Sequence, residues 1–161
     1  FAVALVVQFK PSWTFLAPVV ATLLVGVGEE IAFRRVLFGA LLKRNARHGK
    51  TVVSAVLISA LAFSALHVVN ILGGQSVPQV AVQLVLTFLA GILYAGLYLE
   101  TKSLSALIAF HWLWDAVTFL GLEKKVPAVA AVMGVLTILQ IVVGLVLLAR
   151  YRKLQVLTGR S

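Results

Sequence analysis

Residues 51–71 read TVVSAVLISALAFSALHVVNI and contain no acidic residue, lysine or arginine. At about 1.5 Å of rise per residue, roughly 20 apolar residues in an α-helix cross the ~30 Å hydrocarbon core of a bilayer. Gly73, Gly74 and Pro78 follow the stretch and end it. The segment therefore predicts a membrane-spanning helix, and one ionisable side chain, His67, lies inside it.

The whole chain shares this apolar character. Of its 161 residues, 61% are hydrophobic and only 12% are charged, and the mean hydropathy is +1.07. A soluble fold of this size would expose large apolar patches, whereas a bilayer covers them. We therefore expect an all-α, polytopic transmembrane helical bundle that forms one domain over residues 1–161. Because the chain begins with Phe1 and not with methionine, we expect its N-terminus to be truncated.

Outward from residues 51–71, four further apolar stretches predict spanning helices, which makes about five spans. The stretch before residue 51 is interrupted by two glutamates and two arginines. We interpret it as one helix, because a single span places the glutamate pair near mid-membrane. Residues 1–9 are apolar but too short to cross. The four predicted spans are residues 18–42, 79–99, 103–121 and 126–149.

Basic residues give the chain a net charge of +9, and they cluster at two places, residues 43–50 and the tail 150–161. Five spans place both clusters on one side, which the positive-inside rule predicts to be the cytoplasmic side of the cell membrane. Because the clusters flank apolar spans and no nucleic-acid-binding module surrounds them, we expect contacts with the lipid bilayer and no nucleic acid. The absence of cysteine excludes disulfides and thiolate chemistry.

Three acids and two histidines lie inside predicted spans. An ionised side chain there costs about 2.5–3.5 kcal/mol on insertion scales. Such residues generally face an interior cavity and mark a functional site. These residues are Glu29, Glu30, His67, His111 and Asp115.

The first pair lies in the segment EEIAFR. Glu30 and Arg34 are four residues apart, so they share a helix face and can neutralise each other. Adjacent helical residues point about 100° apart, so Glu29 points elsewhere and can act as a general base in a cavity. The alternative is an ion-pair network that only holds helices together.

The two histidines belong to i, i+4 pairs on later spans. Phe63 and His67 share one face, and His67 needs a specific partner because its neighbours are apolar. His111 and Asp115 also share a face and form either a local hydrogen bond or a pair directed at a substrate carbonyl. A buried structural histidine is the alternative for His67. With Glu29, these residues supply a base, a water-orienting imidazole and oxyanion stabilisers, which is the set that peptide hydrolysis needs.

Three motifs occur in order, each on its own predicted membrane helix. They are E-E-x-x-x-R at residues 29–34, F-x-x-x-H at residues 63–67 and H-x-x-x-(N or D) at residues 111–115. This pattern resembles the CAAX protease and bacteriocin-processing family, also called the Abi family. The resemblance implies an all-helical intramembrane protease of the glutamate type.

The resemblance also implies roles for individual residues. Glu29 would activate water, and His67 would help to hold that water. His111 and Asp115 would line the oxyanion site, although an asparagine is frequent where this chain has Asp115. Supporting residues would be Glu30, Arg34 and Phe63.

The sequence leaves a metal as an alternative, since Glu29, His67 and His111 could supply three zinc ligands and leave a fourth position open. No H-E-x-x-H is present, and the glutamate mechanism implies no cofactor, which is what we expect. The expected substrate is a peptide or a membrane-anchored protein. The alternatives are a non-catalytic immunity or scaffold protein, or a small proton-coupled transporter. Intact motifs disfavour the former, and the lack of paired repeats disfavours the latter.

Overall fold

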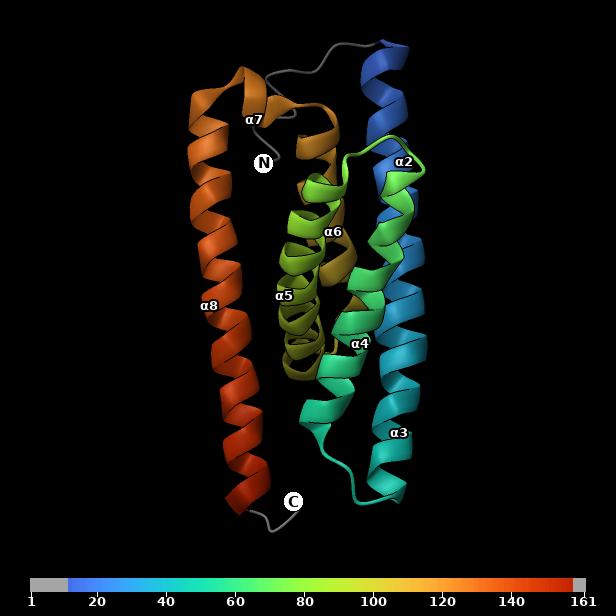
Figure 1. Ribbon diagram of the computed structural model, residues 1–161, viewed down its shortest axis with the longest axis vertical. Helices are drawn as coiled ribbons and strands as arrows, with labels where there is room; N and C mark the ends of the chain where they lie inside the picture. The colour runs from blue at the N-terminus through green and yellow to red at the C-terminus, as the bar shows by residue number, and fades with distance from the viewer. Residues whose placement is uncertain (1–11, 158–161) are drawn as a thin grey trace.

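A computed structural model of the chain describes residues 12–157, and every regular element within that range is a helix (Figure 1). The apolar stretch 1–9 and the basic residue Arg160 lie outside the described residues. The elements are α2 (Trp13–Glu30), the π-helix η1 (Ile31–Phe38), α3 (Gly39–Arg47), α4 (Val52–Leu66), the 3-10 helix η2 (His67–Ile71), α5 (Val77–Thr101), α6 (Leu104–Phe119), α7 (Leu122–Lys125) and α8 (Pro127–Leu157).

The predicted all-α polytopic bundle is confirmed. Four helical segments are long and apolar enough to cross a membrane, namely Trp13–Arg47, Val52–Ile71, Val77–Thr101 and Pro127–Gln155. The remaining predicted span, residues 103–121, is the shorter apolar helix α6, of 16 residues. Its ends are set locally, because Ser103 caps its first turn by accepting from the Ala106 N–H, and Gly121 leaves it with a φ of 61°.

The first and last helices are longer than the spans predicted from the sequence. The first helical segment begins at Trp13 and not at residue 18, and it contains Pro18 in its interior. The last helix continues to Leu157, past the predicted end at residue 149. The first helix begins directly after Ser12, which takes the N-cap position. The extension of the last helix carries basic residues, whose long side chains reach water beyond the hydrocarbon core.

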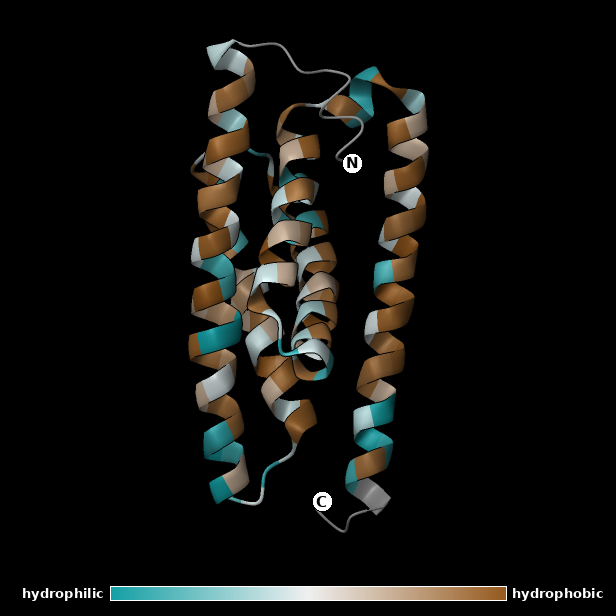
Figure 2. Cartoon of the chain, turned by 180° about the vertical axis from the view of Figure 1, so that it is seen from behind, coloured by the Kyte–Doolittle hydropathy of each residue, from teal (hydrophilic) through white to brown (hydrophobic). Residues whose placement is uncertain are grey.

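The bundle exposes large apolar side chains along its outer surface, as expected where lipid replaces water. Leu24 on α2 is 66% exposed, and Ile138 on α8 is 64% exposed. Figure 2 shows brown, apolar residues along the outer helices and teal, polar residues at the free ends of α3 and α8. These two ends carry the basic clusters and lie at the same end of the bundle, as predicted (Figure 1).

Small residues bring α4 and α5 into close contact. A Cβ added at Gly91 would lie 2.9 Å from the Ala60 Cα, so only glycine fits this position without a shift. Val56, Ala60 and Ala95 are almost completely buried beside it. Small residues of this kind let membrane helices approach each other closely.

A second close contact, between α2 and α6, positions the functional side chains. Gly26 faces the backbone of α6, where an added Cβ would lie 3.5 Å from the Trp112 backbone nitrogen. The Trp112 Nε1–H donates to the Val19 carbonyl across the same interface, at 2.8 Å. The glutamate pair at the end of α2 is thereby held against α6.

Candidate active site

Three carboxylates from two helices converge on the imidazole of His111. The His111 Nδ1 lies 2.9 Å from the Glu30 Oε1. On the other side of the ring, Nε2 lies 3.4 Å from the Asp115 Oδ2 and 3.7 Å from the Glu29 Oε2. His111 itself is buried, with 5% of its surface exposed. The first and third sequence motifs therefore meet at one ring.

The two adjacent glutamates differ in how firmly they are held. Glu30 is fully buried and contacts both His111 and Arg34, whose Nε lies 3.1 Å from the Glu30 Oε2. Glu29 has 18% of its side chain exposed, and its contact with His111 is longer than a hydrogen bond. Glu30 is therefore a fixed partner, whereas Glu29 keeps acceptor capacity for another molecule.

The Glu30–Arg34 pair predicted from the i, i+4 spacing is present, but the contact of Glu30 with His111 was not predicted. The sequence interpretation placed Glu29 on a different helix face from Glu30, and both carboxylates nevertheless reach the same imidazole. They do so from different sides, because Glu30 meets Nδ1 and Glu29 approaches Nε2. The wider turn of η1, which begins at Ile31, lies between this pair of glutamates and α3. Such π-helical insertions frequently mark functional sites.

Arg34 is satisfied by aromatic faces as well as by Glu30. Its guanidinium carbon lies 4.2 Å from the centre of the Phe63 ring and 5.1 Å from the centre of the Tyr94 ring. Within residues 12–157, Nη1 and Nη2 have no hydrogen-bond partner. Cation–π contact is the interaction that stabilises a guanidinium in such a place.

The second motif brings His67 to the same region. The His67 Nδ1 lies 3.0 Å from the Phe63 carbonyl, so this nitrogen donates and leaves Nε2 as an acceptor. The Phe63 ring contacts the His67 ring with centroids 5.2 Å apart and the His111 ring at 5.9 Å. His67 also lies within electrostatic range of Glu29. All three motifs therefore contribute to one cluster.

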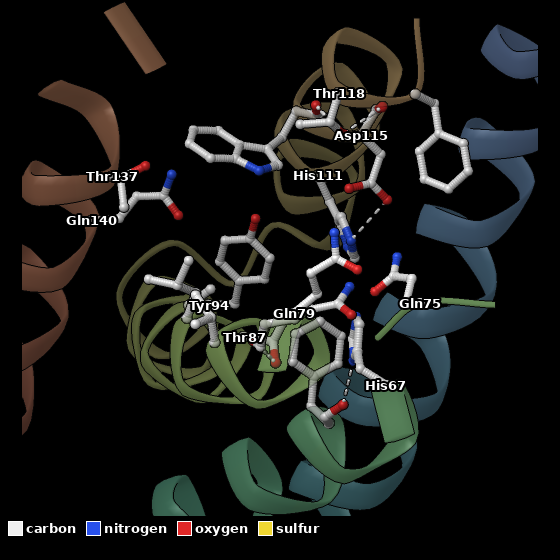
Figure 3. A pocket seen from close by; sticks show the side chains of 17 residues that line it. His67, Gln75, Gln79, Thr87, Tyr94, His111, Asp115, Thr118, Thr137 and Gln140 are labelled. Carbon is white, nitrogen blue, oxygen red and sulfur yellow. Dashed lines mark hydrogen bonds and ion pairs between the residues drawn. The ribbon is translucent and has the colours of Figure 1, made fainter. Parts of the chain in front are cut away.

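The cluster borders a cavity of about 560 Å³. His67, His111 and Asp115 line it, and their side chains point toward one another across it (Figure 3). Glu29 is not among the lining residues and approaches His111 from α2. The predicted catalytic residues therefore lie around His111, and Glu29 and Asp115 both approach its Nε2.

Tyr94 is a lining residue that the sequence analysis missed. It lies on α5, is 3% exposed, and stacks within 5.5 Å of His111 and 6.0 Å of Phe110, centroid to centroid. Its hydroxyl has no hydrogen-bond partner within the described range 12–157, and Figure 3 shows it directed into the cavity. The only signal in the sequence is a tyrosine beside the small residues of the third span.

The three residues of the zinc alternative, Glu29, His67 and His111, belong to this same cluster. Among the described side chains, residues 12–157, no three histidines or acids are placed to hold a metal ion. Both ring nitrogens of His111 face carboxylate oxygens.

Comparison with known proteins identifies the family. The sequence profile described as "Type II CAAX prenyl endopeptidase Rce1-like" matches residues 11–117, a range that includes all three motifs. Comparisons with curated proteins and with solved structures found no match. Because the profile covers most of the chain, this multi-pass membrane protein belongs to the type II CAAX prenyl endopeptidase Rce1-like family of proteases.

Proposed function

We propose that the chain is an intramembrane endopeptidase that hydrolyses peptide bonds in membrane-associated protein or peptide substrates through a water activated by Glu29. The observation that carries this proposal is the convergence of Glu29, Glu30 and Asp115 on His111 beside a cavity. Peptide hydrolysis needs a base, a positioned water and donors for the oxyanion, and these residues supply that set.

Glu29 is the proposed general base because its side chain is only 18% exposed and its contact with His111 is longer than a hydrogen bond. Its carboxylate can therefore accept a hydrogen bond from a water molecule. It takes one proton as the water oxygen attacks the scissile carbonyl carbon. When the C–N bond breaks, Glu29 returns that proton to the departing nitrogen. His67 holds the water through Nε2, since its Nδ1 is bound to the Phe63 carbonyl.

His111 is the proposed oxyanion donor. Glu30 fixes Nδ1 at 2.9 Å, so the ring cannot rotate freely. Nε2 is 3.4 Å from Asp115 and 3.7 Å from Glu29, both beyond a firm N–H···O hydrogen bond, and it can still donate to a carbonyl oxygen. An ionised Asp115 only accepts hydrogen bonds, so we assign it the orientation of His111.

We further propose that this mechanism uses no metal or other cofactor. We place the protein in the cell membrane with residues 43–50 and the C-terminal tail on the cytoplasmic side. The support for this orientation is the shared location of the two basic clusters at one end of the bundle, because basic loops are retained in the cytoplasm (Figure 1).

The proposal is tested with purified protein in lipid nanodiscs and a pool of unrelated fluorogenic peptides. We expect the wild type to cleave the pool and Glu29→Gln to fall to background with an unchanged unfolding temperature, because Gln keeps the shape but accepts no proton. Cleavage by Glu29→Gln at the wild-type rate would contradict the proposal. A wild type that cleaves no peptide would instead favour an immunity or scaffold protein.

A further inference from the structure

The cavity has a second polar wall, which the proposed mechanism does not use. Gln75, Gln79, Gln83 and Thr87 all line it at intervals of four residues. They form one row, in which Gln75 lies in the loop before α5 and the other three lie on α5; Figure 3 labels Gln75, Gln79 and Thr87. Gln75 and Gln79 are exposed at one end of the row, whereas Gln83 and Thr87 are half-buried. The row therefore runs from the surface into the bundle. In a helix surrounded by lipid, a polar row of this kind has to face something other than lipid.

The amide oxygens of Gln79 and Gln83 accept hydrogen bonds from the protein, whereas their amide N–H groups donate none to the described residues. The Gln79 Oε1 accepts from the Ser76 backbone N–H and hydroxyl, both at 2.9 Å. A backbone N–H only donates, so this assignment of the amide is fixed. The Gln83 Oε1 accepts from the Asn70 Nδ2 at 2.9 Å. Both glutamines therefore present free NH₂ donors on the cavity wall.

Gln140 supplies a further donor from the opposite helix, α8. Its Nε2 is buried and has no hydrogen-bond partner among the described residues 12–157. It lines the same cavity, beside Thr137 (Figure 3). A buried amide donor that lacks a partner is costly to keep, and it indicates a ligand that accepts hydrogen bonds.

The spacing of the row matches an extended polypeptide. Four residues of α-helix rise about 6 Å, and two residues of extended chain span about 6.6 Å, so successive amides can meet alternate carbonyls. An isoprenoid chain offers no acceptor, and its binding would leave these donors buried and unpaired. The chemistry of this wall therefore favours a peptide main chain over a lipid chain.

We propose that Gln79, Gln83 and Gln140, here called the amide wall, bind the main-chain carbonyls of an extended, unlipidated polypeptide and hold it beside His111. The inference rests on the proposed peptidase function and names its substrate class. Recognition through the main chain tolerates many side-chain sequences.

The test measures binding on the Glu29→Gln protein, so that it does not depend on cleavage. The probe is a pool of fluorescein-labelled, 12-residue peptides of unrelated sequence, titrated with nanodisc-embedded protein and read by fluorescence anisotropy. The variants are Gln140→Met alone and Gln83→Met with Gln140→Met. The matched control is Gln155→Met, which removes an amide from α8 outside the cavity lining.

We expect Kd to rise about 2- to 12-fold for Gln140→Met, the usual worth of one neutral hydrogen bond, and further for the double variant. The control should bind like the parent, and binding should not require a farnesylated cysteine in the peptides. Methionine keeps the length of glutamine and suits a lipid-embedded helix. The Gln140 Nε2 has no hydrogen-bond partner among the described residues, so Gln140→Met tests the wall without leaving another protein group unpaired.

Three results would overturn the amide wall. The first is binding that requires the farnesyl group. The second is no binding of the unlipidated pool, even if the wild type cleaves peptides. The third is unchanged binding in both variants with a lower kcat in the otherwise wild-type protein, which would assign the row to water supply. Loss of cleavage in Glu29→Gln is a separate readout, so failure of the peptidase proposal is recognised independently.

Discussion

The cluster around His111 and the α4–α5 contact at Gly91 both lie inside the bundle, yet they are built from opposite kinds of residue. The first joins helices through charges and an imidazole at 2.9–3.7 Å. The second joins them through a glycine and an alanine, with no charged group at the contact. Packing through small residues is sufficient to hold membrane helices together. The bundle therefore does not need the charges for association alone, and their presence in the first region indicates chemistry.

The largest loss of stability in either region is expected for Glu30→Gln. This substitution removes the countercharge of buried Arg34 and weakens the contact with the His111 Nδ1. Breaking a buried ion pair from one side typically costs about 3–5 kcal/mol. We expect the free energy of unfolding, measured in mixed micelles, to fall by that order. A variant as stable as the wild type would show that the pair has no structural role.

Asp115 should affect rate more than stability, because it contacts His111 through Nε2 and is partly exposed. We expect Asp115→Ala to lower kcat by about 10²–10³, the usual effect of losing one element of an oxyanion site. Asp115→Asn should remain active, since its amide can still bond to His111 and can donate. The measurement is kcat for both variants on one peptide. If Asp115→Ala matches the wild type, the oxyanion site reduces to His111 alone.

The apolar region should respond in the opposite way. In Gly91→Ala the new Cβ would meet the Ala60 backbone at 2.9 Å, so the two helices have to move apart. Overpacking of this kind costs about 1–3 kcal/mol. We expect a lower free energy of unfolding with a nearly unchanged kcat for the molecules that remain folded. Gly134→Ala on α8, where nothing lies within 4 Å of the added Cβ, is the matched control.

The smallest effect is expected from metal removal. If the cluster works without a metal, EDTA should leave the cleavage rate unchanged. The measurement is the rate before and after chelation, with zinc added back. A loss with EDTA that zinc restores would convert the same residues into ligands and contradict the metal-free mechanism.

Much of this site could be predicted from the sequence because the chain spans a membrane. In a chain that is 61% hydrophobic, acids and histidines within spans are conspicuous, and their i, i+4 spacing correctly gave the Glu30–Arg34 and His111–Asp115 pairs. The contact between His111 and Glu30 was not predictable, because 81 residues separate them and no spacing rule links two different helices. The position of Tyr94 in the cavity wall could not be predicted, because a tyrosine among apolar residues is also typical of helix packing.

Backbone details were the least predictable feature. The switch to a π-helix at Ile31 follows charges that also fit an ordinary α-helix. The row formed by Gln75, Gln79 and Gln83 could be counted in the sequence, but its meaning depends on Gln140, which reaches the same cavity from α8. The functional residues of this bundle lie at contacts between separate helices, and a single sequence does not predict which helices are in contact.

One measurement tests the central claim most directly, namely the activity and the unfolding temperature of Glu29→Gln and Glu30→Gln, determined side by side in the same lipid. The two residues are adjacent, and each contacts His111. We expect Glu29→Gln to abolish peptide cleavage at a wild-type unfolding temperature, and Glu30→Gln to lower the unfolding temperature markedly. Equal losses of stability in both variants, or full activity in Glu29→Gln, would contradict the division between a catalytic and a structural glutamate.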